Sequence, residues 1–143
     1  MAFRNPDDAA VHDLLRSAQT IAVVGLSDNP QRPSYGVASA LLEFGYHIVP
    51  VNPALAVWEG FRAVASLDEA VASLGPGERI DIVDVFRRAQ HVSGIVDDCL
   101  RLKLPALWLQ LGVVDGQAAE RAVAGGVKVV MNRCIKVERT RIG

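Results

Sequence analysis

This chain of 143 residues has few cysteines and few aromatic side chains, and its positive and negative charges nearly balance. The two cysteines, Cys99 and Cys134, are too few for the disulfide framework of a small secreted protein. A reducing, cytoplasmic setting is therefore expected. The net charge is −1, which argues against a broad electrostatic surface for nucleic acid or for an anionic membrane.

Long apolar segments are also missing. The longest, residues 104–114, is interrupted by Pro105, Gln110 and Gly112 and is too short to cross a membrane. The N-terminus is charged and lacks the apolar core of a secretory signal. Half of the residues are nevertheless hydrophobic, and neither a repeat nor a linker divides them. We therefore expect one domain over residues 1–143.

Five short apolar runs are separated by segments with helical spacing. The runs lack polar alternation, which is typical of parallel strands that are buried on both faces. They cover residues 21–25, 47–51, 80–86, 106–111 and 127–131. This alternation predicts an α/β fold: a single Rossmann-like domain with a five-stranded parallel sheet flanked by helices, and with the first strand in the middle.

The helices have recognisable ends. Asn5 is expected to cap the first helix, and Gly45 to end the helix before the second strand. Ser66 and Glu69 form a capping box, and Gly125 follows another helix. The basic tail, residues 136–142, is expected to be a solvated or docked terminus.

The loop after the first strand is a candidate phosphate site, because ligands of such folds bind beyond the carboxyl ends of the strands. Gly25 allows a tight turn, and Ser27 and Asn29 supply polar side chains. Arg32 adds a cation beside a helix that starts near Ser34, where free N–H groups favour anions. An ordinary loop built from turn-forming residues is the alternative.

The usual dinucleotide signature is absent. Ser27 and Pro30 stand where its second and third glycines would be, and no acid follows the second strand, where Val51, Asn52 and Pro53 lie. A carboxylate there would bind a ribose hydroxyl, so its absence weakens a prediction of NAD and leaves phosphorylated nucleotides open.

Polar residues also follow the other strands. Phe86 and Arg87 end the third strand, where an arginine can clamp phosphate. Gln110 and Gly112 follow the fourth strand, and Asn132 and Cys134 follow the fifth. Cys134 is either a reactive thiol or a small buried hydrophobe. No spacing indicates a metal site or a nucleophile–histidine set.

Taken in order, these strand ends resemble the small stand-alone CoA-binding proteins, a family similar to the N-terminal CoA-binding domain of the succinyl-CoA synthetase alpha subunit. The matching segments are residues 21–27, 32–37, 48–53, 81–88, 108–112 and 129–134. The sequence departs from the family at Asn132, where an acid is common, and at Ile135, where a proline is common.

The resemblance implies that CoA lies across the strand ends. It assigns Gly25, Ser27 and the segment Arg32, Ser34, Tyr35 and Gly36 to the nucleotide phosphates. It assigns Val51, Asn52 and Pro53 to the adenosine. It further assigns Phe86, Arg87, Gln110 and Gly112 to the pantetheine or phosphate region, and Asn132 and Cys134 to the thiol end.

The resemblance supplies no reaction, because the phosphorylated histidine of the synthetase belongs to a domain that follows the CoA-binding one. We therefore expect a protein that binds CoA or an acyl-CoA without catalysis of its own. The alternatives are a redox or acyl-transfer protein that uses Cys134, and a regulatory domain that binds NAD or NADP. The expected partner is this small molecule, without nucleic acid, membrane or metal, and both a monomer and a homodimer stay open.

Overall fold

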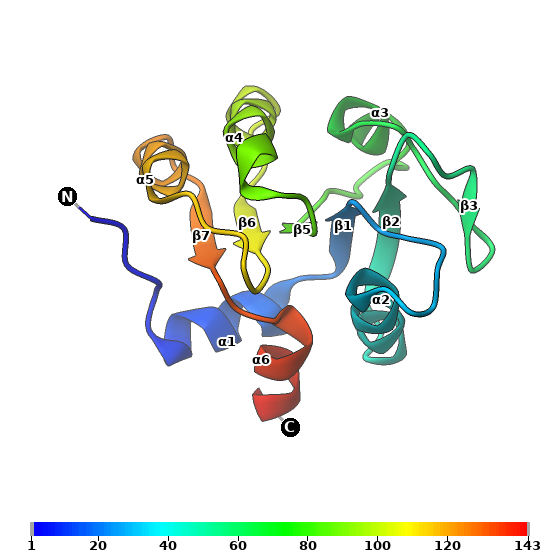
Figure 1. Cartoon of the computed structure of the whole chain (residues 1–143), viewed down its shortest axis with the longest axis horizontal. Coiled ribbons are helices and arrows are strands. Elements are labelled where there is room, and N and C mark those ends of the chain that lie inside the picture. The colour runs from blue at the N-terminus through cyan, green and yellow to red at the C-terminus, as the bar shows by residue number, and fades with distance from the viewer. Residues whose placement is uncertain (1, 143) are drawn as a thin grey trace.

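The computed structural model describes residues 2–142, so Met1 and Gly143, the ends of the predicted domain, lie outside it. Helices and strands alternate along most of the chain, as Figure 1 shows. In chain order the elements are α1 (Asp8–Ser17), β1 (Thr20–Val24), α2 (Pro33–Glu43), β2 (His47–Val51), β3 (Val57–Trp58), β4 (Phe61–Arg62), α3 (Leu67–Ala72), β5 (Ile82–Val85), the short 3-10 helix η1 (Ala89–His91), α4 (Val92–Arg101), β6 (Ala106–Leu109), α5 (Gly116–Ala124), β7 (Lys128–Met131) and α6 (Ile135–Ile142).

The main sheet has five parallel strands in the order β2-β1-β5-β6-β7. The predicted fold and strand segments are confirmed, with one correction: the central strand is β5, and β1 lies beside it. The chain leaves β1 toward one edge to form β2 and then crosses back to form β5. Only β2 therefore lies on that side of β1. The direction of the connections reverses between β1 and β5, which makes their carboxyl ends the switch point of the sheet.

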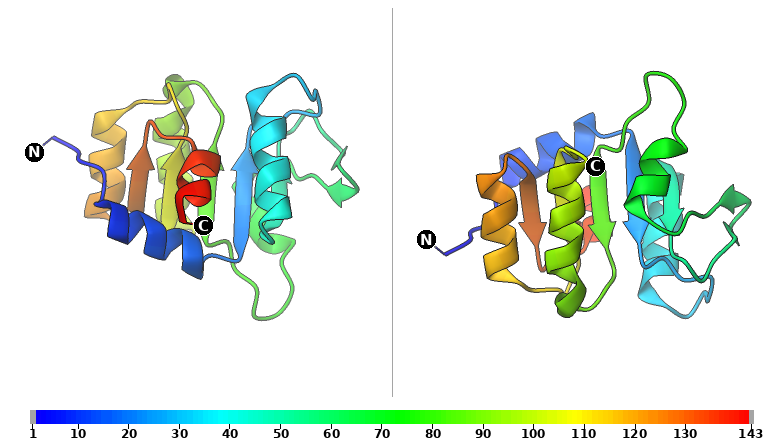
Figure 2. Two further views of the ribbon diagram at one scale, coloured as in Figure 1. Left: turned by 90° about the horizontal axis from the view of Figure 1, so that it is seen from below. Right: turned by 90° about the horizontal axis from the view of Figure 1, so that it is seen from above.

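Helices cover both faces of this sheet. Figures 1 and 2 show α1, α2 and α6 on one face and α3, α4 and α5 on the other. Each face has its own cluster of buried apolar side chains. Because both faces are covered, every residue of β1, β5 and β6 is buried, which explains why these strands show no polar alternation in the sequence.

Most helix ends form as predicted. Ser66 accepts a hydrogen bond from the Glu69 amide (3.2 Å), and Glu69 accepts one from the Ala65 amide (2.8 Å). Gly45 follows α2 with a φ of 103°, a conformation that glycine adopts at little cost.

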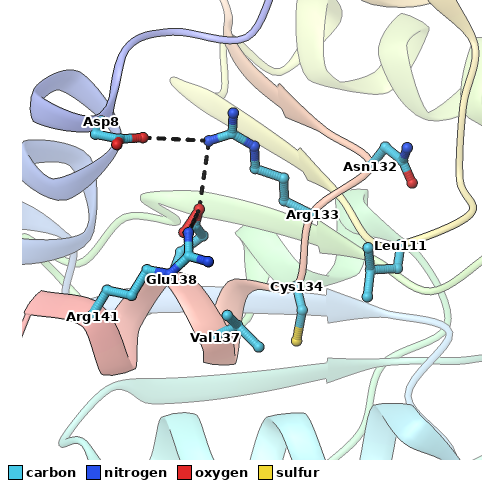
Figure 3. Close-up of a pocket in the computed structure, with 8 residues that line it drawn as sticks. All are labelled: Asp8, Leu111, Asn132, Arg133, Cys134, Val137, Glu138 and Arg141. Atoms are coloured by element: carbon cyan, nitrogen blue, oxygen red, sulfur yellow. Dashed lines mark hydrogen bonds and ion pairs between the residues drawn. The ribbon is translucent and has the colours of Figure 1, made fainter.

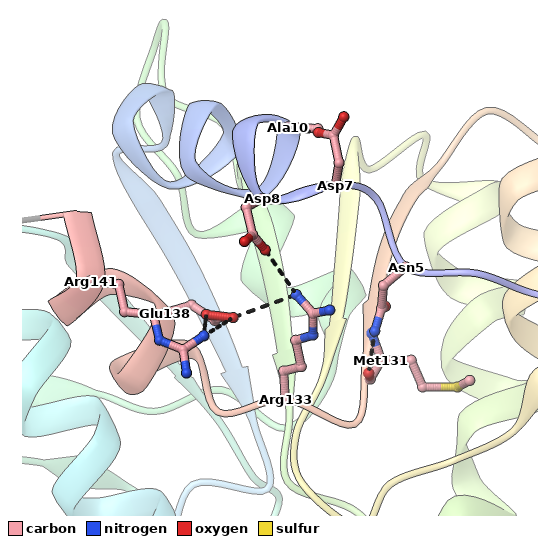
Figure 4. Close-up of polar contacts among 8 residues, drawn as sticks. All are labelled: Asn5, Asp7, Asp8, Ala10, Met131, Arg133, Glu138 and Arg141. Atoms are coloured by element: carbon pink, nitrogen blue, oxygen red, sulfur yellow. Dashed lines mark hydrogen bonds and ion pairs between the residues drawn. The ribbon is translucent and has the colours of Figure 1, made fainter.

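The cap predicted for the first helix is wrong. Asp7 is the cap of α1, and its carboxylate accepts from the Ala10 amide at 2.9 Å. The Asn5 side chain instead donates to the Met131 carbonyl (3.0 Å) and accepts from its amide (2.7 Å), as Figure 4 shows in part. An asparagine amide matches the unpaired N–H and C=O of an edge strand, so Asn5 covers the free edge of β7.

A hairpin of two short strands and a C-terminal helix are additions to the sequence prediction. β3 and β4 form a hairpin whose two turn residues, Glu59 and Gly60, both have positive φ. The tail forms the helix α6, which docks between α1 and α2 with Ile135 and Glu138 buried. Among residues 2–142, no helix is both long and apolar enough to cross a membrane.

Candidate functional site

The site begins where β1 and β5 end side by side. The Phe86 amide donates to the Val24 carbonyl at 2.8 Å, and the Gly25 amide donates to the Val51 carbonyl at 2.9 Å. Gly25 has a φ of 85°, and a Cβ atom there would lie 2.9 Å from the Phe86 carbonyl oxygen. Only glycine fits this turn without strain. The turn brings the first loop beside Arg87.

The first loop is shaped by its own polar side chains. The Ser34 hydroxyl accepts from the Ser27 amide, the Ser27 hydroxyl from the Asn29 amide (both 3.0 Å), and the Asn29 side chain from the Gln31 amide (2.9 Å). These bonds carry the chain around to the start of α2, where no side chain caps the first turn. Arg32 precedes this turn and is exposed. A cation beside an uncapped helix start suits an anion.

A cleft of about 670 Å³ lies at the switch point. It unites most of the site residues that the sequence predicts. Those that line it are Gly25, Ser27, Arg32, Ser34, Phe86, Arg87, Gln110, Gly112 and Cys134. The cleft adds Pro33, Val37, Arg88, Leu111 and Val113 to the predicted set. All of these except Val113 lie within the segments that carry the family resemblance, and Arg88 directly follows Arg87.

Five predicted residues do not line this cleft or a neighbouring one: Asn29, Tyr35, Gly36, Asn52 and Pro53. The Tyr35 ring contacts Trp58 of the hairpin edge-to-face, with 5.6 Å between the ring centroids. The Asn52 side chain donates to the Leu26 carbonyl (3.0 Å) and accepts from the Ala54 amide (2.8 Å). The side-chain amide of Asn52 therefore joins the loop after β2 to the loop after β1.

A second pocket of about 470 Å³ lies between α3 and α4 and shares Arg87 with the main cleft. Val51 lines it, as do Ser66, Leu67 and Ile95. The Arg87 guanidinium lies 3.2 Å from the His91 ring nitrogen, which helps to hold it between the two spaces. Sequence reasoning placed Val51 and Arg87 in the site but missed the residues of α3 and α4 that complete this pocket.

The opposite end of the cleft is fixed by three side chains. Gln110 is buried and accepts from the Ile135 amide (3.1 Å), Asn132 accepts from the Gly112 amide (2.8 Å), and the Trp108 indole donates to the Arg133 carbonyl (2.9 Å). The amide oxygens of Gln110 and Asn132 thus position the segment that carries Cys134.

A third pocket of about 320 Å³ lies beyond this segment and is drawn in Figure 3. It shares Leu111 and Cys134 with the main cleft, and Asn132 lines it too. Cys134 is half-buried, whereas Cys99 is buried in the core. Burial, together with the nearby charge of Asp98, raises the pKa of the Cys99 thiol to about 12. In the part of the chain that the structure describes, no group of three metal-binding side chains occurs.

The glycine turn, the uncapped helix start and the arginines at the switch point define a Rossmann-like α/β domain with a ligand cleft at the strand ends. Residues 19–140 match the CoA binding domain, and the chain belongs to this family.

Relatives of similar length support this assignment. The chain is 41% identical to the uncharacterized protein YneT of Bacillus subtilis (strain 168), over 94% of this chain and 96% of that protein. A solved structure from Thermus thermophilus, titled cell-free ID.343, is 35% identical, with a TM-score of 0.85 over 96% of this chain and all of that one.

A larger protein contains a similar fold. The dinucleotide forming acetyl-coenzyme A synthetase 1 of Ca. Korarchaeum cryptofilum matches 82% of this chain with 27% of its own, at a TM-score of 0.65 and 21% identity. At this identity the likeness concerns the fold alone.

Proposed function

We propose that this protein binds coenzyme A, free or as a thioester, across the carboxyl ends of β1, β5, β6 and β7. The observation that carries the proposal is the continuity of three pockets along this edge. Arg87 joins the second pocket to the main cleft, and Leu111 with Cys134 joins the main cleft to the third. CoA is a long molecule with a nucleotide at one end and a thiol at the other, which suits such a row.

The phosphates are assigned to the middle of this row. Arg32, Arg87 and Arg88 all line the main cleft beside the uncapped start of α2. Guanidinium groups bind phosphate oxygens in a bidentate way that lysine does not. The chain has an overall charge of −1, so these cations form a local feature of the cleft.

The orientation of the ligand follows from the two ends of the row. The second pocket combines the apolar residues Val51, Leu67 and Ile95 with polar side chains, namely those of Ser66, His91, Asp97 and Asp98. Apolar walls with hydrogen-bonding groups suit a nucleoside. The opposite end has Phe86, Leu111 and Val113 with few polar groups, which suits the pantetheine arm. We therefore assign the adenosine to the second pocket and the thiol to the vicinity of Cys134.

The proposal stops at binding. Among the described residues, the main cleft has neither a histidine nor a carboxylate, the groups most often used for proton transfer, while His91, Asp97 and Asp98 line the second pocket and Asp8 and Glu138 the third. The proposal therefore concerns binding and assigns no reaction.

Isothermal titration with CoA, dephospho-CoA, NADP and NAD tests the proposal, with CoA expected to bind most tightly. Arg32→Ala should weaken CoA binding by about 10- to 100-fold, the usual worth of a charge-assisted hydrogen bond. Arg16→Ala is the matched control, because Arg16 is exposed on α1 and lines none of the three pockets. Absence of CoA binding at millimolar concentration would overturn the proposal, as would tighter binding of NADP or NAD.

A comparison of CoA with dephospho-CoA then shows which phosphate Arg32 contacts. If Arg32 contacts the ribose 3′-phosphate, Arg32→Ala weakens CoA more than dephospho-CoA. Equal losses assign Arg32 to the pyrophosphate.

A second candidate function is thiol–disulfide exchange at Cys134, favoured by the half-buried thiol between two pockets. The Cys134 thiolate would attack CoA disulfide, forming a protein–CoA disulfide and releasing one CoA thiolate. Intact-mass measurement after incubation with CoA disulfide detects this adduct, which must be missing in Cys134→Ser. An unmodified wild-type protein removes the candidate.

A further inference from the structure

The pocket beyond Cys134 has an apolar side and a cationic side. Leu111 and Val137 are unusually exposed for aliphatic residues, at 66% and 48%. Arg133 and Arg141 line the same space and both contact Glu138 (Figure 3). An aliphatic wall next to guanidinium groups is the environment of a short carbon chain with an anionic end.

The two arginines keep most of their hydrogen-bonding capacity. Within residues 2–142, Arg133 donates a single long hydrogen bond, of 3.5 Å, to Glu138, and its distance to the Asp8 carboxylate is 3.8 Å. Arg141 donates through one nitrogen to both Glu138 oxygens, at 3.0 and 3.2 Å. A guanidinium has five N–H donors, so both side chains retain donors for a further carboxylate.

The charged side chains of the pocket balance formally, with Arg133 and Arg141 against Asp8 and Glu138, so its attraction for an anion rests on the N–H donors that the arginines keep free. Figure 4 shows Glu138 between the two guanidinium groups, so that one carboxylate is shared by two cations. The Glu138 side chain is 4% exposed and fixed in place. The other acid, Asp8, has a side chain that is 79% exposed at the first turn of α1, where solvent screens its charge.

We propose that this third pocket receives the acyl group of a CoA thioester and favours acyl groups that end in a carboxylate. The inference rests on the proposed function, because only the assigned orientation of CoA brings its thiol to Cys134. Leu111 and Val137 then contact the methylene groups, and Arg133 and Arg141 bind the terminal carboxylate. The ligand class is the thioester of a short dicarboxylic acid.

The competing explanation is that these arginines serve only to hold α6 against α1. Thioesters matched in shape separate the two explanations. Malonyl-, succinyl- and glutaryl-CoA are each compared with the thioester in which methyl groups replace the two carboxylate oxygens. Titration should show at least one carboxylated member bound about tenfold more tightly than its methyl counterpart.

Arg133→Gln should abolish this preference while the affinity for free CoA stays unchanged. Lys136→Gln is the control, since Lys136 is exposed on α6 and does not line the pocket. If Arg133→Gln fails to fold, Arg141→Gln replaces it, because the Arg141 side chain is 63% exposed and Glu138 keeps Arg133 as a partner.

The outcomes separate this inference from the proposed function. Binding of free CoA with no preference in any pair overturns the acyl pocket alone. A preference that survives in Arg133→Gln, or in the Arg141→Gln variant that replaces it, also overturns it. Absence of binding for free CoA and for every thioester overturns the proposed function itself.

Discussion

The parallel strands all begin on one side of the sheet, here called the amino edge, and all end on the other, the carboxyl edge. Polar groups have opposite roles at these two edges. At the amino edge the Asp81 carboxylate accepts from the Gln19 amide (2.8 Å), the Thr20 amide (3.0 Å) and the Arg79 side chain (3.0 Å). At the carboxyl edge Arg32, Arg87 and Arg88 surround a cleft instead. The polar groups at the amino edge thus stabilise the fold, while the arginines at the carboxyl edge are placed to bind a ligand.

Asp84 lies between the two edges, within β5, whereas Asp81 directly precedes that strand. It is completely buried, and within the described chain neither of its oxygens has a hydrogen-bond partner. Burial raises the pKa of this carboxyl well above its usual value of 3.8. Two aspartates three positions apart thus make opposite contributions: one is stabilised by its donors, and the other is costly when ionised.

The largest expected effect is at the turn where the carboxyl edge begins. Gly25→Ala should destabilise the protein by about 2–4 kcal/mol, because the new Cβ meets the Phe86 carbonyl and the backbone needs a positive φ. CoA binding should fall with it. Urea denaturation at neutral pH measures the loss.

Gly126→Ala is the matched control, because Gly126 also has a positive φ (93°) but open space around its Cβ position. Backbone strain alone predicts a loss of about 1–2 kcal/mol. An equal loss in both variants would show that the close approach at Gly25 has no energetic role.

The next largest effect distinguishes the structural role of the amino edge from the binding role of the carboxyl edge. Asp81→Asn should lower the free energy of unfolding by about 1.5–3 kcal/mol, since it weakens hydrogen bonds to a charged acceptor. Its affinity for CoA should not change. Arg32→Ala should do the reverse, losing affinity while its stability stays within about 0.5 kcal/mol of wild type. Loss of CoA affinity in Asp81→Asn would contradict the division of roles.

This division explains how much the sequence could predict. The buried strands and the glycines at their ends follow from local patterns, so the fold, the switch-point loop and the set around Gly25, Arg87 and Gly112 were predictable. The resemblance assigns Tyr35 and Asn52 to the ligand, but the partners that the structure gives their side chains, Trp58 and Leu26, come from other segments. Such tertiary contacts, and the pocket behind Arg87, leave no local pattern.

A smaller effect, opposite in sign to that of Asp81→Asn, is expected when Asp84 is replaced. Asp84→Asn should be more stable than wild type at pH 7, by about 1 kcal/mol or more. The unfolded carboxyl ionises near pH 3.8, while the folded one stays protonated to higher pH. As the pH rises between these two pKa values, the wild type loses stability because folding takes up a proton. The Asp84→Asn variant has no carboxyl group at this position and therefore does not lose stability in this way.

Urea denaturation between pH 4 and pH 8 follows this difference. The stability gap between Asp84→Asn and the wild type should widen as the pH rises, by at most about 1.4 kcal/mol per pH unit. A gap of constant size would mean that Asp84 is already ionised in the folded protein. In that case the burial of this carboxyl would not control its protonation.

The smallest effect concerns thiol reactivity and uses the two cysteines as reporters of core and cleft. At pH 8 an aromatic disulfide reagent should modify one thiol of the folded protein, Cys134, because Cys99 is buried and its pKa of about 12 leaves almost no thiolate. CoA should slow this reaction if it reaches the end of the cleft that Cys134 lines. Cys134→Ser should abolish the fast reaction and leave Cys99 to react only after unfolding. Modification of both thiols at equal rates would contradict the contrast between core and cleft. A rate at Cys134 unaffected by saturating CoA would instead place the ligand's thiol away from this residue, and with it the acyl pocket.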